Sequence, residues 1–100
     1  MGDELCGKVA VEFFGTAFFL GAILLTAGMQ MQVPLVGAAL VVALYVGSLF
    51  NGDGNFNPAV TTMILSSGGM DATKWLAFVT AQVAGGLAAS AGVSAVLKNA

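Results

Sequence analysis

Three long apolar segments constrain the fold of this chain more than any other feature. They cover about residues 9–29, 33–50 and 73–97. A transmembrane helix needs about 20 predominantly apolar residues to cross about 30 Å of hydrocarbon, and each segment approaches that length. Asp71 precedes the third segment as an expected N-cap, and Trp75 lies at the expected depth of the membrane interface. The sequence therefore predicts an all-α membrane protein with three transmembrane helices.

The composition independently favours the bilayer over water. Of 100 residues, 58% are hydrophobic, 8% are charged and 14 are glycine. Soluble domains carry about 25% charged residues, so this chain could not cover a water-facing surface. We expect residues 1–100 to form a single multi-pass membrane domain, with the lipid bilayer as a partner. The few basic residues form no cluster, which argues against a nucleic-acid partner.

The connection between the second and third segments, about residues 51–69, is more than a turn. It begins with Asn51-Gly52-Asp53-Gly54-Asn55, a run of turn residues that cannot continue a helix. We expect Asp53 to be a turn residue at the membrane surface. About ten mostly apolar residues follow from Pro58 and end at Gly68-Gly69, and at 1.5 Å per residue they would form a helix of about 15 Å, half of the hydrocarbon thickness. The sequence predicts a re-entrant half-helix whose preceding backbone lines a wet cavity.

Asn57-Pro58-Ala59 lies where this half-helix should begin. Asparagine is a strong N-cap, and proline is favoured at the first helical position. If Asn57 caps with its side-chain oxygen, its NH2 group stays free to donate beside the positive end of the helix dipole. Such a donor at the membrane midplane suits a pore for small neutral polar molecules. The alternative is an ordinary N-cap in a buried loop, with its spare donors satisfied by protein.

Three motifs occur in order along the chain. They are Glu12-Phe13-Phe14-Gly15-Thr16, the segment from Gly54 to Thr61, and the segment from Ala81 to Gly86. They resemble the first-helix motif E-F-x-G-T, the first N-P-A signature and the third helix of the major intrinsic proteins, the aquaporins and aquaglyceroporins. Members of that family carry two inverted three-helix repeats, and the resemblance covers about residues 8–97 with a single repeat like the N-terminal one. It implies a half-aquaporin fold and a passive pore for water or small neutral solutes such as glycerol.

The resemblance implies a set of pore residues and also shows departures from the family. The expected pore and solute-binding residues are Gly54, Asn55, Phe56, Asn57, Pro58, Ala59 and Val60. The family's second signature is usually followed by a filter arginine, and a histidine often lies two positions before the signature asparagine. This chain has no arginine, Asn55 occupies the histidine position, and the apolar Val60 follows Ala59. The choice among water, glycerol and other solutes is therefore left open, as is whether Phe56 constricts a pore or packs in the core.

Glu12 is the only ionisable residue deep in an apolar segment. A charge at the centre of a spanning helix costs about 2.5–3.5 kcal/mol on insertion scales, so Glu12 should face protein. We expect it to accept backbone N–H groups from the re-entrant loop, and we expect Gln82 to support the loop from the third segment. The alternative is a proton-relay carboxylate, although no histidine, arginine or second carboxylate accompanies it.

One repeat can hardly enclose a pore, so the sequence implies a partner. The simplest is a homo-oligomer in which two copies insert in opposite directions as an antiparallel dimer, with higher clustering or another membrane subunit left open. Lys8 and Lys74 are expected on one side of the membrane and Lys98 on the other. A difference of one lysine between the two sides is too small to fix the orientation of the chain in the membrane. Insertion in both directions requires such a weak preference.

An enzyme finds little support in the sequence. The chain has no histidine, one cysteine and no cluster of carboxylates, so neither a metal site nor an acid–base pair can be assembled from one copy. We expect no catalytic residues, no cofactor and no metal. The alternative function is a non-conducting structural subunit of a larger membrane complex, which would not need Asn57 and the glycine-rich loop.

Overall fold

The computed structural model describes residues 2–99, which form four helices. Their bounds are Asp3–Thr26 for α1, Gln32–Leu49 for α2, Pro58–Ser66 for α3 and Ala72–Lys98 for α4. The helices α1, α2 and α4 are long and apolar enough to cross a membrane, in agreement with the three apolar segments of the sequence. With 9 residues, α3 is much shorter.

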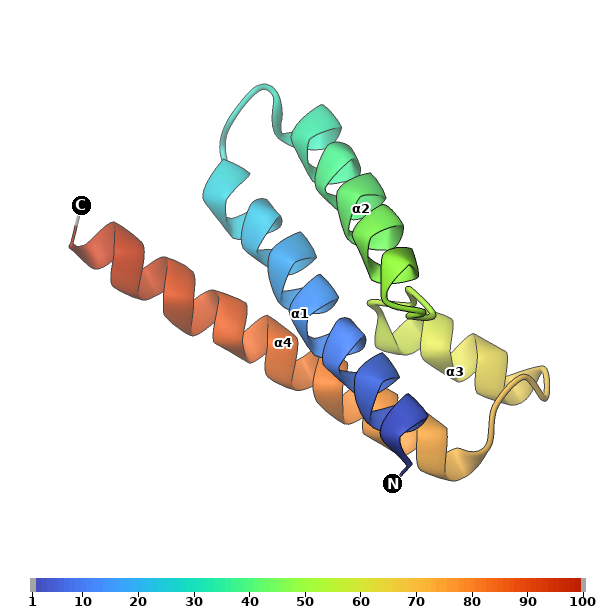
Figure 1. Cartoon of the computed structure of the whole chain (residues 1–100). Coiled ribbons are helices and arrows are strands. Elements are labelled where there is room, and N and C mark those ends of the chain that lie inside the picture. Colours follow the sequence, from blue (N-terminus) through green and yellow to red (C-terminus); the bar gives the residue numbers. More distant parts are fainter. Residues whose placement is uncertain (1, 100) are drawn as a thin grey trace.

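The helix α1 is the centre of the arrangement, because it packs against both α2 and α4. Figure 1 shows α1 and α2 side by side and antiparallel, with α4 crossing α1. The short α3 packs against α4 and lies near the beginning of that helix (Figure 1). α3 therefore lies at the end of the bundle where α1 and α4 begin.

Small residues allow α4 to approach α1 closely. Ala81, Gly85 and Ala89 recur at every fourth position of α4 and are all buried. A methyl group added at Gly85 would lie 2.6 Å from the carbonyl oxygen of Phe13, so only glycine fits at this crossing. These small residues therefore allow the close packing of α4 against α1.

Several large polar side chains are buried, and many large apolar side chains are exposed. Apart from Phe78, the chain's largest fully buried side chains are polar, namely Glu12, Thr16, Thr61 and Gln82. Large apolar side chains point outward instead, with exposed fractions of 68% for Phe14 and Leu87. Such a surface is costly in water and suits hydrocarbon or a membrane partner.

The start of α1 differs most from the hydropathy boundaries, whereas α3 and α4 show local signals at their ends. α1 begins at Asp3 rather than near residue 9, because hydropathy marks the depth of hydrocarbon whereas a helix can extend beyond it. Asp71 caps α4 by accepting a 2.8 Å hydrogen bond from the backbone N–H of Lys74. After α3, Gly68 adopts a φ of 83°, the left-handed conformation that glycine supplies at helix ends.

Candidate pore-lining loop and its supports

The carboxylate of Glu12 binds the loop that precedes α3. Oε1 accepts hydrogen bonds from the backbone N–H of Phe56 at 2.8 Å and from Gln82 Nε2 at 2.8 Å. Oε2 accepts from the backbone N–H of Asn55 at 3.1 Å. Glu12 is fully buried, and its three partners are all N–H donors, which suits the acceptor-only oxygens of a carboxylate. The Glu12 side chain of α1 thus binds both the loop and Gln82 of α4.

Thr61 is a second junction, which the sequence reasoning did not single out. Its hydroxyl oxygen accepts hydrogen bonds from Gln82 Nε2 at 2.7 Å and from Asn55 Nδ2 at 3.1 Å. The same hydroxyl donates to the backbone carbonyl of Asn57 at 3.2 Å. A signal was present, because Thr61 lies one helical turn after Asn57 in a predicted half-helix. Its burial and its two donors, however, depend on tertiary packing.

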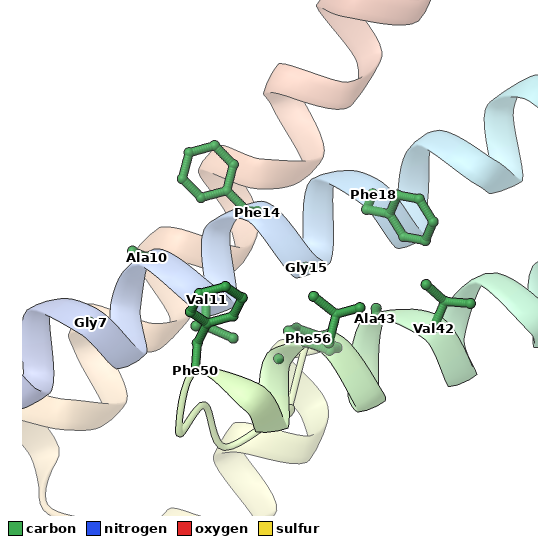
Figure 2. A pocket seen from close by; sticks show the side chains of 12 residues that line it. Gly7, Ala10, Val11, Phe14, Gly15, Phe18, Val42, Ala43, Phe50 and Phe56 are labelled. Atoms are coloured by element: carbon green, nitrogen blue, oxygen red, sulfur yellow. The ribbon is translucent and has the colours of Figure 1, made fainter.

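The ring of Phe56 is buried between α1 and α2. Figure 2 shows it beneath Gly15 of α1 and beside Ala43 of α2. A methyl group added at Gly15 would overlap this ring, and one added at Gly47 would lie 3.4 Å from it. Phe56 also has a φ of 53°, which is uncommon for a bulky residue and is held here by the ring's slot and by Glu12. The side chains of Phe56 and Asn55 are thus packed in protein.

Asp53 joins the loop to two helices at the end of the bundle. Its carboxylate binds Lys8 Nζ of α1 at 2.8 Å and Lys74 Nζ of α4 at 2.7 Å. Lys8 Nζ also donates to the carbonyl of Asn51 at 2.7 Å, and Lys74 Nζ lies 5.2 Å from the centre of the Phe78 ring. Partial desolvation raises the pKa of Asp53, but the hydrogen bonds from Lys74 and Lys8 outweigh it and hold this pKa below its usual value.

α3 itself is attached to α4 at its outer side. Trp75 Nε1 donates to the hydroxyl of Thr62 at 3.0 Å. This bond and the Gln82–Thr61 bond bind two successive residues of α3 to α4, which fixes the direction in which α3 points.

Asn57 occupies the N-cap of α3, and its Oδ1 accepts a 2.8 Å hydrogen bond from the backbone N–H of Ala59. Within residues 2–99, the Nδ2 group of Asn57 meets no acceptor. Asn57, Pro58 and Ala59 are exposed, whereas Val60 is half-buried. The first turn of α3 therefore presents an unpaired amide donor and a small side chain on the surface of the chain.

The glycines of the loop bring its backbone close to α2. Gly54 has a φ of 72°, and a methyl group added there would lie 2.9 Å from Leu44 Cδ2. Within the described part of the chain, no hydrogen bond reaches the carbonyls of residues 52–56. Within the described residues, these carbonyls and the Asn57 Nδ2 group are therefore without a hydrogen-bond partner.

Two cavities lie along α1, and neither includes Asn57. One of about 590 Å³ lies between α1 and α2 and contains Phe56 in its lining (Figure 2). The other, of about 710 Å³, lies between α1 and α4. Both are mainly apolar, so neither resembles a path for a polar solute. Among residues 2–99, no group of three or more histidine, cysteine, aspartate or glutamate residues is placed to hold a metal ion.

Sequence comparison relates the chain to a membrane transport protein. Glycerol uptake facilitator protein-like 6 of Lactiplantibacillus plantarum is 36% identical over 91 residues, which cover 86% of this chain and 42% of that protein. The chain therefore spans less than half the length of this relative. No family model matches the chain, and no solved structure matches it significantly. The similarity indicates a relation to the major intrinsic protein family, and together with three apolar helices it points to a membrane protein related to channels rather than to enzymes.

Proposed function

We propose that the chain is a half-aquaporin channel subunit. It pairs with a second, inverted copy or another half-channel and forms a passive pore for water or small neutral solutes such as glycerol. In this proposal α3 is re-entrant, and its first turn meets the first turn of the partner's α3 near the membrane midplane. The relative's printed name, a glycerol uptake facilitator-like protein, supports this class of solute.

The observation that carries the proposal is the unpaired amide of Asn57. Its oxygen is used by the cap on α3, so its Nδ2 group can donate to the oxygen of a permeating molecule. Two such donors on one water would turn both of its hydrogens outward and interrupt proton hopping, and two positive helix ends would repel cations. A spacer subunit would have no use for this donor.

The length of α3 supports a re-entrant position. Its 9 residues correspond to about 14 Å, half of the hydrocarbon thickness. Irregular backbone at that depth is tolerated where protein buries it or water wets it. Glu12 and Thr61 bind this part of the chain within the protein, and the carbonyls of residues 52–56 accept no hydrogen bond from the described residues, which leaves them available to water in this proposal.

The placement of the lysines supports insertion in both directions. Lys8 and Lys74 bind the same carboxylate of Asp53 and therefore lie at one end of the bundle. Lys98 ends α4, whose length carries it to the opposite end. Two lysines against one leave a weak orientation signal, which allows copies of both orientations in one membrane.

Stopped-flow swelling of liposomes that contain only this protein tests the function, first with water and then with glycerol. We expect the wild type to conduct and Asn57→Ala to lose most of the conductance. Asn99→Ala is the matched control, since Asn99 is an exposed asparagine at the end of α4. A wild-type protein that is inserted but conducts neither solute would favour the non-conducting structural subunit.

Sided labelling tests the pairing separately. Cys6 is the single cysteine and is exposed near the start of α1. A membrane-impermeant maleimide should label about half of the copies in sealed vesicles and all copies after permeabilisation. Labelling of every copy from one face would reject the antiparallel homodimer and leave a different half-channel as the partner.

A further inference from the structure

Two buried side-chain oxygens at the crossing of α1 and α4 have no hydrogen-bond partner among residues 2–99. They are Thr16 Oγ1 on α1 and Gln82 Oε1 on α4. Both residues are only 1% exposed, so solvent outside the chain does not reach these atoms. Buried polar atoms in native proteins are almost always hydrogen-bonded, either to protein or to an ordered water. Two such atoms on helices in contact therefore indicate a ligand that neither helix supplies.

Thr16 and Gln82 lie close together at this crossing. Glu12, one turn before Thr16 on α1, accepts a 2.8 Å hydrogen bond from Gln82 Nε2. Gly85, one turn after Gln82 on α4, comes so close to α1 that an added methyl group would lie 3.3 Å from Thr16 Cβ. Side chains one helical turn apart have Cβ atoms about 5–6 Å apart. Thr16 and Gln82 are therefore within reach of a single small molecule between them.

The hydroxyl of Thr16 is available as a donor. Two other threonines of the long helices use their hydroxyls within their own helix, since Thr26 donates to the carbonyl of Ala22 at 2.6 Å and Thr80 donates to that of Leu76 at 2.7 Å. Thr16 makes no such bond within the described chain. A hydroxyl has one hydrogen to donate and two lone pairs. The Thr16 side chain thus brings to the crossing a donor that its own helix does not use.

Two acceptors lie at the same crossing. Gln82 Nε2 donates to Glu12 Oε1 and Thr61 Oγ1, which uses both of its hydrogens and leaves Oε1 on the other side of the amide as an acceptor. The carbonyl of Phe13 is the second acceptor, because a methyl group added at Gly85 would lie 2.6 Å from its oxygen. That carbonyl accepts one N–H within α1, and its second lone pair remains. The crossing thus offers one donor and two acceptors.

We propose that one buried water molecule joins α1 to α4 at this point. Its oxygen accepts the hydrogen of Thr16 Oγ1, and its own two hydrogens are donated to Gln82 Oε1 and to the carbonyl of Phe13. Three hydrogen bonds are the usual number for a buried water, whereas Ca²⁺ or Mg²⁺ would need about six oxygens. A water that donates to Oε1 holds the Gln82 amide with its Nε2 toward Glu12 and Thr61. This site depends on the contact of α1 with α4 and not on conduction.

Thermal unfolding of Thr16→Val in detergent, followed by circular dichroism, tests whether the hydroxyl has a partner. Valine keeps the shape of threonine and removes the donor, so the water loses one of its three bonds. We expect the midpoint to fall by about 5 °C. Thr80→Val is the matched control, since Thr80 is exposed and bonds only within its own helix. A Thr16→Val midpoint at or above that of the wild type would overturn the proposal, because a hydroxyl without a partner does not stabilise the fold.

Crystal structures of the wild type and of Thr16→Val, at a resolution that shows ordered water, locate the bound molecule. In the wild type we expect one water within hydrogen-bond distance of Thr16 Oγ1, Gln82 Oε1 and the carbonyl of Phe13. Thr16→Val should lack this water. A wild-type crossing in which Thr16 bonds directly to Gln82, with no water between them, would contradict the proposal even if valine lowers the midpoint.

Discussion

The carboxylate of Glu12 accepts a 2.8 Å hydrogen bond from the backbone N–H of Phe56 and so ties α1 to the residue before Asn57. The distance between these residues in the sequence makes this bond a tertiary constraint on the loop. It acts together with the bonds to Asn55 and Gln82. The position of the Asn57 amide therefore depends on a buried acceptor in another helix.

Replacement of Glu12 should destabilise the fold in a graded way. Glu12→Gln keeps one acceptor oxygen but sets an NH2 group against an N–H donor, which should cost about 1–3 kcal/mol. Glu12→Ala leaves three buried donors without an acceptor and should be worse. Thermal unfolding in detergent, followed by circular dichroism, measures both. The exposed Glu4→Gln is the control, and equal stability of all three variants would contradict the role of Glu12.

Gly15→Ala should destabilise the chain through overlap with the Phe56 ring. Overpacking of this kind costs about 1–3 kcal/mol. Gly37→Ala is the matched control, because nothing lies within 4 Å of the added methyl group in α2, and alanine there should stabilise the helix by up to about 1 kcal/mol. The double variant Gly15→Ala/Phe56→Leu should recover part of the loss. A Gly15→Ala protein as stable as Gly37→Ala would show that the ring does not occupy this slot.

Thr61→Val should be more harmful than Thr61→Ser. Valine removes the acceptor of Gln82 Nε2 and Asn55 Nδ2, and a buried donor without a partner costs about 1–3 kcal/mol. Serine keeps the hydroxyl. Thr80→Val serves as control, since Thr80 is exposed and bonds only within its own helix. If Thr61→Val had a higher denaturation midpoint than Thr61→Ser, side-chain shape would matter more than the hydroxyl. That result would argue against a hydrogen-bonding role of Thr61.

Acid should weaken the Asp53 cluster. The pKa of Asp53 is lower in the folded chain than its ordinary value of 3.8, so its stabilising effect is complete above that value. The effect is lost as the pH falls below 3.8 and through the lower folded pKa. Its side chain is 29% exposed, so each ion pair should contribute only about 0.2–1 kcal/mol. Asp53→Asn should be less stable at pH 7 and should lose less than the wild type on acidification. If the stability of the wild type and of Asp53→Asn depended on pH in the same way, Asp53 would have no stabilising role. Asp3→Asn, at an exposed position, is the control.

The spanning helices and the start of α3 could be predicted from the sequence because they depend on local signals. Hydropathy marked three long helices, and Asn57 before Pro58 marked an N-cap followed by a proline at the start of α3. Asp71 marked the start of α4 in the same way. Each of these signals lies within one continuous stretch of the sequence.

The contacts that support the loop were only partly visible in the sequence. Glu12 stood out because a lone carboxylate in an apolar segment needs donors. Asp53, in contrast, looked like a simple turn residue, because its partners Lys8 and Lys74 come from other helices. The direction of the Phe56 ring depends on a left-handed backbone and on two distant glycines. The partners of Asp53 and the direction of the Phe56 ring depend on tertiary packing, which cannot be predicted from a single sequence.

The most direct test of the central claim is a cross-link between two copies at the first turn of α3. Ala59→Cys on a Cys6→Ser background places a thiol beside Asn57 on the exposed end of α3, and Ala88→Cys places one on exposed α4 as the control. In lipid vesicles, a short bifunctional thiol reagent should give a covalent dimer at position 59 and mostly monomer at position 88. Monomer at both positions, in protein that is fully inserted, would contradict a pore in which two inverted copies bring their Asn57 residues together.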